Sequence, residues 1–514
     1  MSLANPQTGV SPINIHNIPL DVMYDVFLLC LSSGTSPVPS RRSAPLNLMW
    51  VCRSWRQFAC DISRLWTTLK LSGGPNEVLN WEPMVRHWLQ LAGDRPMSLS
   101  YDFTSDRAIS STPILTTSLL PFASRIRRLE LRLESLQYLP LRQILPSGFL
   151  LLESISFTNL ESFGDWRSPR VRSIIDLSKC RCLRHADIAW ISARRRNINN
   201  FNNGRRMLLE FKLPWSQLTS LKIVDSLATP TEAVGILKQC TSLIECHVSL
   251  GLGALIPNDT PAHPMLPPAV LADLTSLTIE WKFLPFFLTT DGICPIIRAL
   301  TLPVLTTLNL AAGGTPSSAL CTALCDLQQR SDFPLLHFSL SGDSNPTGLR
   351  SFFVHTPSLR SLSFDLFEQK VYIELASMLA DSCTNTNTHA TIILPALTSL
   401  SLSLCAFGVL NGITGITAYQ PLPLDEGALR NYREMYSLSG TIIPTLARAR
   451  FWPAGEAESL AKFSHLVLRT WRSRESPGEY CGQEWVSDTG GIRNLVEKLE
   501  SEGLTIEFPV DYID

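Results

Sequence analysis

The chain has 514 residues, of which 45% are hydrophobic and 17% are charged. These fractions are typical of a folded protein with a substantial core, and they exclude an intrinsically disordered chain. The formal net charge of −1 gives the chain as a whole no electrostatic reason to bind nucleic acid or an anionic membrane. The length predicts more than one domain.

The cysteines and the N-terminal sequence indicate an intracellular protein. Thirteen cysteines, scattered and odd in number, are typical of reduced, buried thiols rather than of a disulfide framework or a zinc site. The first residues have neither the basic start nor the apolar core of a secretory signal. The longest uncharged stretch, Ala299–Cys325, is broken by proline and glycine, which argues against a membrane span. We therefore expect a cytoplasmic and/or nuclear location.

Residues 1–12 are expected to be disordered, and the first predicted element is a helix that begins near Pro19, a residue type suited to a first helical turn. Its apolar residues form two stripes at helical spacing. One stripe contains Leu20, Met23, Phe27 and Leu31, and the other contains Val22, Val26 and Leu29.

A second helical segment follows a Ser/Pro-rich gap, and Leu65 and Trp66 close the module after it. Its apolar residues are expected to share one face: Leu48, Val51, Cys52, Trp55, Phe58 and Ala59. A module of about sixty residues is marginal on its own, and a large exposed apolar patch usually marks an interaction surface. Either these stripes pack on the rest of the chain, or a partner covers them.

The order of these residues resembles the F-box motif. Its most specific part is Val51-Cys52-Arg53-x-Trp55-Arg56 followed by Leu65-Trp66. The chain departs from the motif where Ile18 replaces the commoner Leu and Asp21 stands where Glu is frequent. The insert SSGTSPVPSRRSA is also longer than usual, as in F-box proteins of mushroom-forming fungi.

The resemblance implies that residues 13–72 form a three-helix domain. Such a domain binds a Skp-type adaptor and so joins a cullin–RING ubiquitin ligase. By position, the residues of its core or its adaptor face would be Ile18, Pro19, Leu20, Val26, Phe27, Val51, Cys52, Trp55, Leu65 and Trp66.

Residues 73–122 are predicted to hold a connecting helix and the first strand. Pro83 suits the first turn of the helix, and Gly93 is a plausible residue to end it. Met97, Leu99 and Tyr101 then alternate as in a strand. A helix that ends in Gly-x-x-Pro and runs into an alternating strand also follows the F-box in many fungal members, so the resemblance extends to about residue 103.

Residues 123–410 contain a degenerate repeat, apolar-x-x-apolar-x-apolar, with a mean spacing of roughly 30 residues. Its ten copies begin at Ile126, Leu152, Leu183, Leu218, Leu243, Leu274, Leu305, Leu335, Leu359 and Leu397. This pattern predicts a leucine-rich-repeat-like solenoid of the α/β class, with a curved parallel sheet and outer helices, although the asparagine of tight repeats is missing. An unrelated α/β fold is the alternative. One expected outer helix, Thr231–Cys240, would have Thr231 as its N-cap.

Between the apolar strand positions, polar residues are expected to face the concave side of the sheet. These are Glu130, Ser156, Asp187, Lys222, His247, Thr278, Asn309, Ser339, Ser363 and Ser401. Concave ladders are the usual ligand surface of solenoids, so Glu130, Asp187, Lys222, His247 and Asn309 are predicted target contacts. The alternative is a solvated sheet face without a partner.

Two clusters of arginine suggest capture of an acidic or phosphorylated segment. They are Arg125, Arg127, Arg128 and Arg132, and Arg194, Arg195, Arg196, Arg205 and Arg206. The alternative is an exposed surface whose charge nearby acids balance.

Residues 411–514 are predicted to be atypical repeats and a C-terminal cap, because an open solenoid end must be covered. Segments 421–436 and 456–466 look helical, and Phe463, Leu466 and Leu468 suggest one more repeat. Gly503 is expected to end a last helix before a final strand.

No phosphate-binding loop, nucleophile elbow or zinc-protease helix occurs in the sequence. We therefore expect a non-catalytic protein without metal or cofactor, which binds neither nucleic acid nor membrane. The first hypothesis is a substrate-recognition subunit of a Skp–cullin–F-box ubiquitin ligase, with an unknown protein target. The second is a leucine-rich-repeat scaffold without ubiquitin transfer. The third treats the first seventy residues as a cap that packs wholly on the repeats and leaves no free apolar face.

Overall fold

The chain forms two compact units, Met1–Leu183 and Arg184–Asp514. The predicted boundaries after residues 72 and 122 both fall inside the first unit. Residues 1–12, 421–436 and most of 456–466 lie outside the described part of the chain. The computed structural model describes residues 18–31, 39–72, 81–102, 120–134, 148–161, 175–192, 211–227, 229–250, 268–281, 293–312, 318–341, 346–366, 374–375, 377–379, 393–404, 465–473, 497–501, 503–507 and 510–513.

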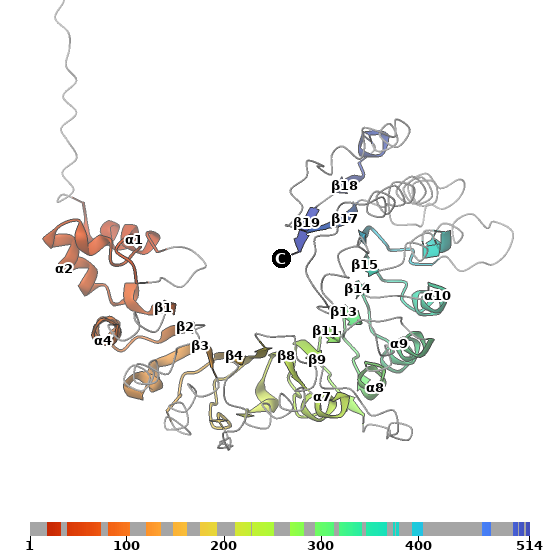
Figure 1. Cartoon of the computed structure of the whole chain (residues 1–514), viewed down its shortest axis with the longest axis horizontal. Helices are drawn as coiled ribbons and strands as arrows, with labels where there is room; N and C mark the ends of the chain where they lie inside the picture. Colours follow the sequence, from red (N-terminus) through yellow and green to blue (C-terminus); the bar gives the residue numbers. More distant parts are fainter. Residues whose placement is uncertain are drawn as a thin grey trace, which may run out of the picture. The chain divides into compact units, whose positions relative to one another are not determined.

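The first unit begins as a helical module and continues as a parallel sheet of order β1-β2-β3-β4 (Figure 1). Its helical elements are α1 (Leu20–Leu29), η2 (Leu48–Trp50), α2 (Arg53–Asp61), η3 (Ser63–Trp66), α4 (Glu82–Leu91) and η5 (Leu120–Arg125). Its strands are β1 (Thr68–Ser72), β2 (Met97–Asp102), β3 (Ile126–Glu134), β4 (Ser154–Glu161) and β5 (Ile175–Asp176).

Aromatic side chains close the core of the helical module. Phe27 of α1 is fully buried, and its ring centroid lies 4.9 Å from that of Trp55 and 5.3 Å from that of Phe58. The buried Trp66 indole donates a hydrogen bond of 2.8 Å to the carbonyl of Ala59. Trp66 also packs edge-on against Trp88 of α4, with 4.8 Å between ring centroids. The module therefore has a small core of its own, which continues into the connecting helix.

The second helical segment is not one helix, contrary to the prediction of a single face over residues 48–59. Cys52 is extended, with φ −158° and ψ 174°, and separates η2 from α2. Its Sγ accepts the backbone N–H of Trp55 at 3.5 Å, so Cys52 is the N-cap of α2. This break turns Val51 outward and leaves its side chain 58% exposed.

The predicted connecting helix and alternating strand are present, but this strand is β2, because the first strand of the sheet, β1, already lies at Thr68–Ser72 within the predicted helical module. Helix α4 has Pro83 in its first turn, and Gly93 follows it with φ +58°. A positive φ is a conformation that only glycine adopts without strain, so this residue type ends the helix. The alternating residues of β2, Met97, Leu99 and Tyr101, are all buried.

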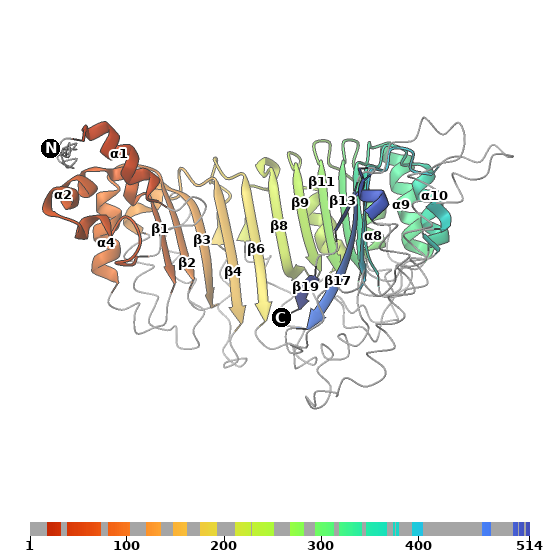
Figure 2. The same cartoon turned by 90° about the horizontal axis from the view of Figure 1, so that it is seen from above.

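The second unit is a longer parallel sheet of order β6-β8-β9-β11-β13-β14-β15-β16-β17-β18, with β19 also paired to β17 (Figure 2). Its strands are β6 (His185–Ser192), β7 (Phe211–Lys212), β8 (Ser220–Leu227), β9 (Glu245–Leu250), β10 (Ala269–Val270), β11 (Ser276–Trp281), β12 (Leu300–Thr301), β13 (Thr307–Ala312), β14 (His337–Ser341), β15 (Ser361–Leu366), β16 (Ser399–Leu404), β17 (His465–Ser473), β18 (Thr505–Glu507) and β19 (Val510–Ile513). Its described helices include η9 (Trp215–Gln217), α7 (Pro230–Leu237), α8 (Cys294–Ala299), α9 (Ser318–Ser331) and α10 (Pro346–Val354).

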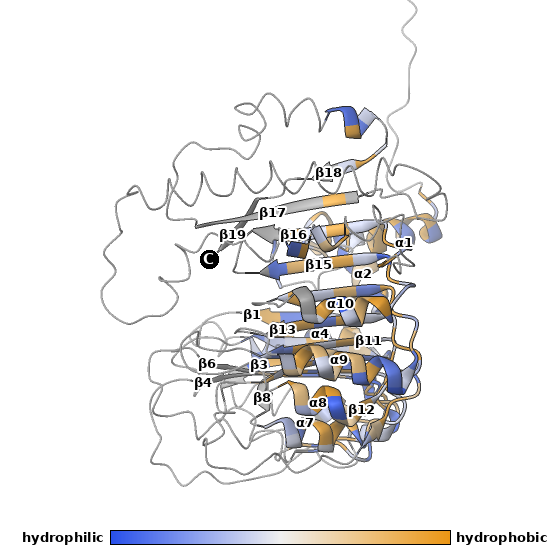
Figure 3. Ribbon diagram, turned by 90° about the vertical axis from the view of Figure 1, so that its right-hand side faces the viewer, coloured by the Kyte–Doolittle hydropathy of each residue, from blue (hydrophilic) through white to orange (hydrophobic). Residues whose placement is uncertain are grey.

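The repeat predicted from the sequence is confirmed. In all ten copies, none of the three apolar positions is more than 3% exposed. Neighbouring copies pair in register, so that Leu277 lies opposite Cys246 on one side and Leu308 on the other. Helices α7, α8, α9 and α10 lie side by side along one face of the second unit's sheet (Figure 1), and they carry much of the hydrophobic colouring there (Figure 3). This is the α/β fold class that the sequence predicts.

Threonines directly before four strands join neighbouring repeats through hydrogen bonds. The carbonyl of Thr275 accepts the backbone N–H groups of Thr306 and Thr307 at 2.9 and 3.0 Å. The Thr306 hydroxyl donates to the same carbonyl at 3.1 Å. The same hydroxyl bond joins neighbouring repeats at three further positions, Thr219 to Arg184, Thr275 to Ile244, and Thr398 to Arg360. We call these four contacts the threonine rungs.

Helix α7 begins two residues earlier than predicted. Thr229, not Thr231, is its N-cap, because Pro230 occupies the first helical position. The Thr229 hydroxyl accepts the N–H of Glu232, and the Thr229 N–H donates to the Glu232 carboxylate, both at 3.2 Å. The sequence Thr-Pro-Thr-Glu therefore forms a capping box. The predicted buried face remains, with Val234, Leu237 and Cys240 all at most 1% exposed.

Candidate functional site

The first candidate site is the outer face of helix α1. Of the two predicted stripes, only one faces the core of the module, through buried Met23 and Phe27. The other stripe is open, with Val22 47%, Val26 40% and Leu29 83% exposed. An amphipathic surface helix normally has one apolar side, so α1 carries a second apolar side that its own module does not bury.

Further exposed apolar side chains lie at the end of η2, where Trp50 is 60% and Val51 is 58% exposed. Leu20, in the first turn of α1, is 70% exposed. The structure describes twelve exposed large apolar side chains, and six of them fall between Leu20 and Val51. These six exposed residues of the helical module are together called the N-terminal apolar face: Val22, Val26 and Leu29 share one side of α1, Leu20 lies at its start on the other side, and Trp50 and Val51 lie at the end of η2.

The structure divides the ten residues that the F-box resemblance singled out. Phe27, Leu65 and Trp66 are buried in the module, at no more than 2% exposure. Pro19 is the N-cap of α1, and Cys52 is the N-cap of α2. Ile18 and Trp55 are half-buried, and the exposed members are Leu20, Val26 and Val51.

The N-terminal apolar face contains three residues that were not among the predicted site residues, Val22, Leu29 and Trp50. Val22 and Leu29 belong to the second predicted stripe, so the helical spacing already placed them beside Val26. Trp50 gave a weaker signal, because it lay outside the predicted shared face of residues 48–59 and the sequence does not show that the helical segment ends before Cys52, two residues later.

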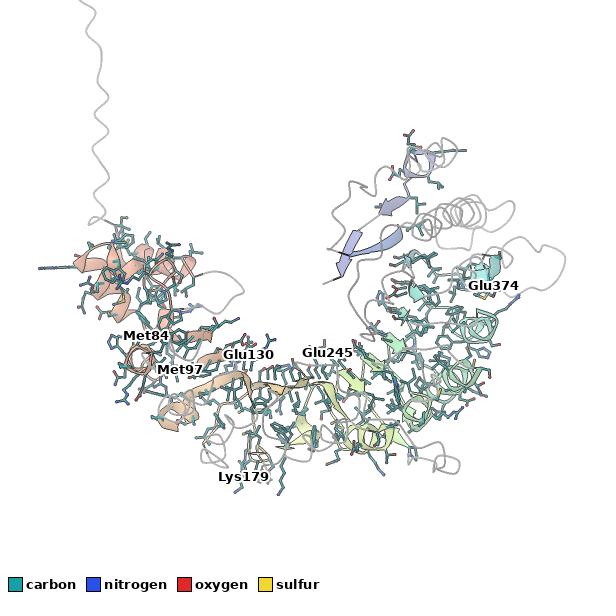
Figure 4. The ribbon with its side chains drawn as sticks, in the orientation of Figure 1. Met84, Met97, Glu130, Lys179, Glu245 and Glu374 are labelled. Carbon is teal, nitrogen blue, oxygen red and sulfur yellow. The ribbon has the colours of Figure 1, made fainter. Side chains whose placement is uncertain are left out.

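The second candidate site is the face of each sheet that lies opposite the outer helices. In the second unit the predicted ladder is in register from strand to strand. Glu245 of β9 projects from this face, away from α7 and α8 (Figure 4). The aligned row consists of Asp187, Lys222, His247, Thr278, Asn309, Ser339, Ser363 and Ser401.

Four of the five predicted target contacts lie in this row. Lys222 Nζ is 3.7 Å from Asp187 Oδ2. His247 Nε2 is 3.2 Å from Glu280 Oε1 on the next strand, and the Asn309 amide donates to the Thr278 hydroxyl at 3.2 Å. These pairs hold polar side chains on the sheet face at fixed positions.

Glu130, the fifth predicted contact, lies on the sheet of the first unit, on the exposed face of β3 (Figure 4). Its strand neighbour in register is Ser156. On the same sheet, Arg132 lies 3.8 Å from Asp102.

The charge of the side chains on the sheet face of the second unit differs between its first and its later strands. Charged groups gather on β6 to β11, at Asp187, Lys222, Glu245 and Glu280. From β14 to β16 the same register positions are mostly serine: Ser339, Ser341, Ser361, Ser363, Ser399, Ser401 and Ser403. Within this unit the sheet face is therefore charged on its first strands and mostly small and polar on β14 to β16.

The first arginine cluster does not form one basic patch. Arg125 lies over the Phe122 ring at 5.3 Å, and partial burial lowers the pKa of its guanidinium. Arg127 pairs with Glu153 at 2.6 Å, which raises the pKa of Arg127 through a hydrogen bond and the opposite charge. The second cluster, residues 194–206, lies outside the described part of the chain.

The buried cysteines have protonated thiols at neutral pH. Burial raises the pKa of Cys180 and Cys321 to about 11, and that of Cys240 to about 12. Burial also raises the pKa of Cys246. Such thiols are poor nucleophiles and poor metal ligands.

The described residues offer neither a metal site nor a membrane span. No group of three or more His, Cys, Asp or Glu side chains in that part of the chain is arranged to hold a metal ion. Among the same residues, no helix combines the length and apolarity that crossing a bilayer requires.

Comparisons with known proteins give little further information. No protein-family model matches the sequence, and neither does any curated protein. One structure that matches is the "Crystal structure of Rad7 and Elc1 complex in yeast", at 13% identity and a TM-score of 0.26. The match covers 68% of this chain and 89% of the matched chain. A likeness this weak does not define a function.

Proposed function

We propose that this protein is a substrate-recognition subunit of a Skp–cullin–F-box type ubiquitin ligase. In this proposal the N-terminal module docks on a Skp-type adaptor, and the sheet faces hold a target protein. The chain itself supplies no catalysis. It holds the target near a separate subunit that transfers ubiquitin, so that an encounter in solution becomes an effectively intramolecular step.

The observation that carries the proposal is the N-terminal apolar face. Residues of the F-box-like motif supply both an aromatic core around Phe27 and an apolar surface that the chain leaves exposed. Fully burying a wholly exposed Leu or Val side chain is worth about 1.5–3 kcal/mol, and a partner would gain most of this at Leu29, which is 83% exposed, and less than half of it at Val26, which is 40% exposed. The face therefore offers a partner several such contributions, and exposed apolar clusters of this kind usually mark interaction surfaces.

The same observation disfavours the third hypothesis, in which the first seventy residues only cap the repeats. That hypothesis requires the module to leave no free apolar face, whereas Leu29 alone is 83% exposed. The second hypothesis, a scaffold without ubiquitin transfer, needs the same docking face and is separated from the first only by a functional test.

The first test is binding of the purified full-length chain to a purified Skp-type adaptor by isothermal titration. The double variant Val26→Ser, Leu29→Ser removes apolar groups from the docking face. Its matched control is Val270→Ser on β10, because Val270 is 61% exposed but lies in the second unit. We expect the double variant to lose binding and the control to bind like the native chain. Lack of binding by the native chain would overturn the proposal.

A second test separates a ligase subunit from a scaffold. Adding the native chain, the adaptor and a cullin–RING assembly to cell extract should cause ubiquitination of proteins that co-purify with the chain. The double variant should not support this transfer. Stable binding of the adaptor without any transfer would favour the scaffold.

A further inference from the structure

The insert between α1 and η2 places Arg41 against Trp50, a residue of the N-terminal apolar face. The guanidinium carbon of Arg41 lies 4.7 Å from the centroid of the Trp50 ring. Arg41 and Trp50 are both exposed, and Trp50 belongs to the face described above. Within the described residues, the Arg41 side chain has no other partner.

Stacking on an aromatic ring uses the flat side of a guanidinium and leaves its N–H edge available. That edge presents a planar fork of donors, which matches a carboxylate with two parallel hydrogen bonds. A cation–π contact at an exposed site is modestly stabilising, so Trp50 favours this position of Arg41, and the pair presents an apolar ring beside a fork of donors that fits a carboxylate.

The charge of the surrounding segment has the same sign as Arg41. Residues 39–60 contain four arginines, Arg41, Arg42, Arg53 and Arg56, and no aspartate or glutamate. The Arg56 Nε donates to the carbonyl of Met49 at 3.1 Å, next to Trp50. A partner that covers this edge of the face must bring negative charge, or it would bury unpaired cations.

We propose that the Arg41–Trp50 pair binds an acidic segment of the adaptor, in which a carboxylate adjoins an apolar side chain. The inference rests on the proposed function, since it takes the adaptor as the occupant of the N-terminal apolar face. It adds a polar anchor, supplied by the long insert, to a contact that is otherwise apolar. The carboxylate meets the Arg41 edge, and the neighbouring apolar group packs against Trp50.

A second copy of the chain is the competing occupant, because α1 carries Asp21 and Asp25 on its exposed surface. Light scattering of the native chain at the concentrations of the binding assay distinguishes the two occupants. We expect a monomer. A dimer that Arg41→Gln dissociates would overturn the proposal.

The test compares adaptor affinities of the native chain, Arg41→Gln, Arg41→Glu and Arg42→Gln, measured by titration at several salt concentrations. Arg42→Gln is the matched control, since it removes the same charge from the adjacent residue, which has no aromatic ring beneath it in the structure. We expect Arg41→Gln to weaken binding about tenfold and Arg41→Glu to weaken it further. Arg42→Gln should have a much smaller effect. The affinity of Arg41→Gln should also depend less on salt than that of the native chain.

The outcomes separate this inference from the proposed function. If the native chain binds and Arg41→Gln and Arg42→Gln bind equally well, the adaptor docks without the Arg41–Trp50 anchor and only this inference fails. If the native chain does not bind the adaptor, both proposals fail. Because Arg41 is exposed, all four proteins should have the same thermal unfolding midpoint, which excludes misfolding as the cause of a weaker affinity.

Discussion

The threonine rungs should stabilise the second unit, and Thr306→Val isolates one of them. Valine keeps the branched shape of threonine but lacks the hydroxyl that donates to the Thr275 carbonyl at 3.1 Å. A neutral hydrogen bond contributes about 0.5–1.5 kcal/mol net. The Thr275 carbonyl keeps its two backbone donors at 2.9 and 3.0 Å, so no polar group is left unpaired. We therefore expect a loss near the lower limit, about 0.5–1 kcal/mol in the free energy of unfolding.

Urea unfolding followed by circular dichroism measures this loss, with hydrogen exchange to confine it to the repeats beside Thr306. Thr306→Ser is the control, because serine keeps the donor, and it should lie closer to the native chain than Thr306→Val does. The triple variant Thr275→Val, Thr306→Val, Thr398→Val should lose about 2 kcal/mol if the rungs are nearly additive. The reasoning is refuted if the triple variant unfolds at the same urea concentration as the native chain.

Two further predictions concern the helical module and the buried thiols. Phe27→Ala should lower the free energy of unfolding of the helical module by about 3–5 kcal/mol and remove the module's transition in a calorimetric scan. Leu29→Ser should leave that transition unchanged. Equal effects of the two substitutions would contradict the assignment of the two faces of α1. The buried thiols of Cys180 and Cys240 have a pKa of about 11 and about 12, above the ordinary value of 9.0. Their contribution to stability is therefore complete below about pH 9 and is lost as the pH rises toward these values, by about 1.4 kcal/mol per pH unit for each thiol. Measuring the urea midpoint of unfolding between pH 8 and pH 11 tests this loss of stability per pH unit. The Cys240→Ala variant should lose less stability over the same pH range.

The sheet could be predicted from the sequence because one physical requirement recurs in every copy of the repeat. A short parallel strand has to bury an apolar edge against its neighbours and the outer helices, and this requirement fixes three positions in each copy. The register then places His247 and Asn309 in one row without further information. The missing asparagine argued against the repeat, but the in-register strands show that the repeat forms without it.

Local geometry was harder to predict than periodicity. The spacing of residues 48–59 is compatible with one continuous helix, and nothing in the pattern reveals that Cys52 is extended. The consequence is that Val51, which was predicted to lie on the shared apolar face, is 58% exposed. The error at Thr231 has a similar origin, since Thr229 and Thr231 are both capable caps and only the preference of Pro230 for the first helical position decides between them.

Charge patterns gave the least reliable indication of a site. Four arginines between residues 125 and 132 look like one basic patch in the sequence, yet alternate residues of a strand point to opposite faces. Arg127 pairs with Glu153, while Arg132 lies near Asp102 on the sheet face. A cluster in sequence becomes a cluster in space only where the backbone turns its side chains the same way.

Helix α1 shows why the sequence alone left the docking question open. Its two apolar stripes have similar helical spacing, so on spacing alone either could face the core. The structure distinguishes them because Trp55 and Phe58 pack around Phe27, and that contact turns Val26 and Leu29 outward. The core therefore selects which stripe remains exposed. A substitution at Phe27 should act on stability first, whereas one at Leu29 should act on binding, and the proposed function depends on that separation.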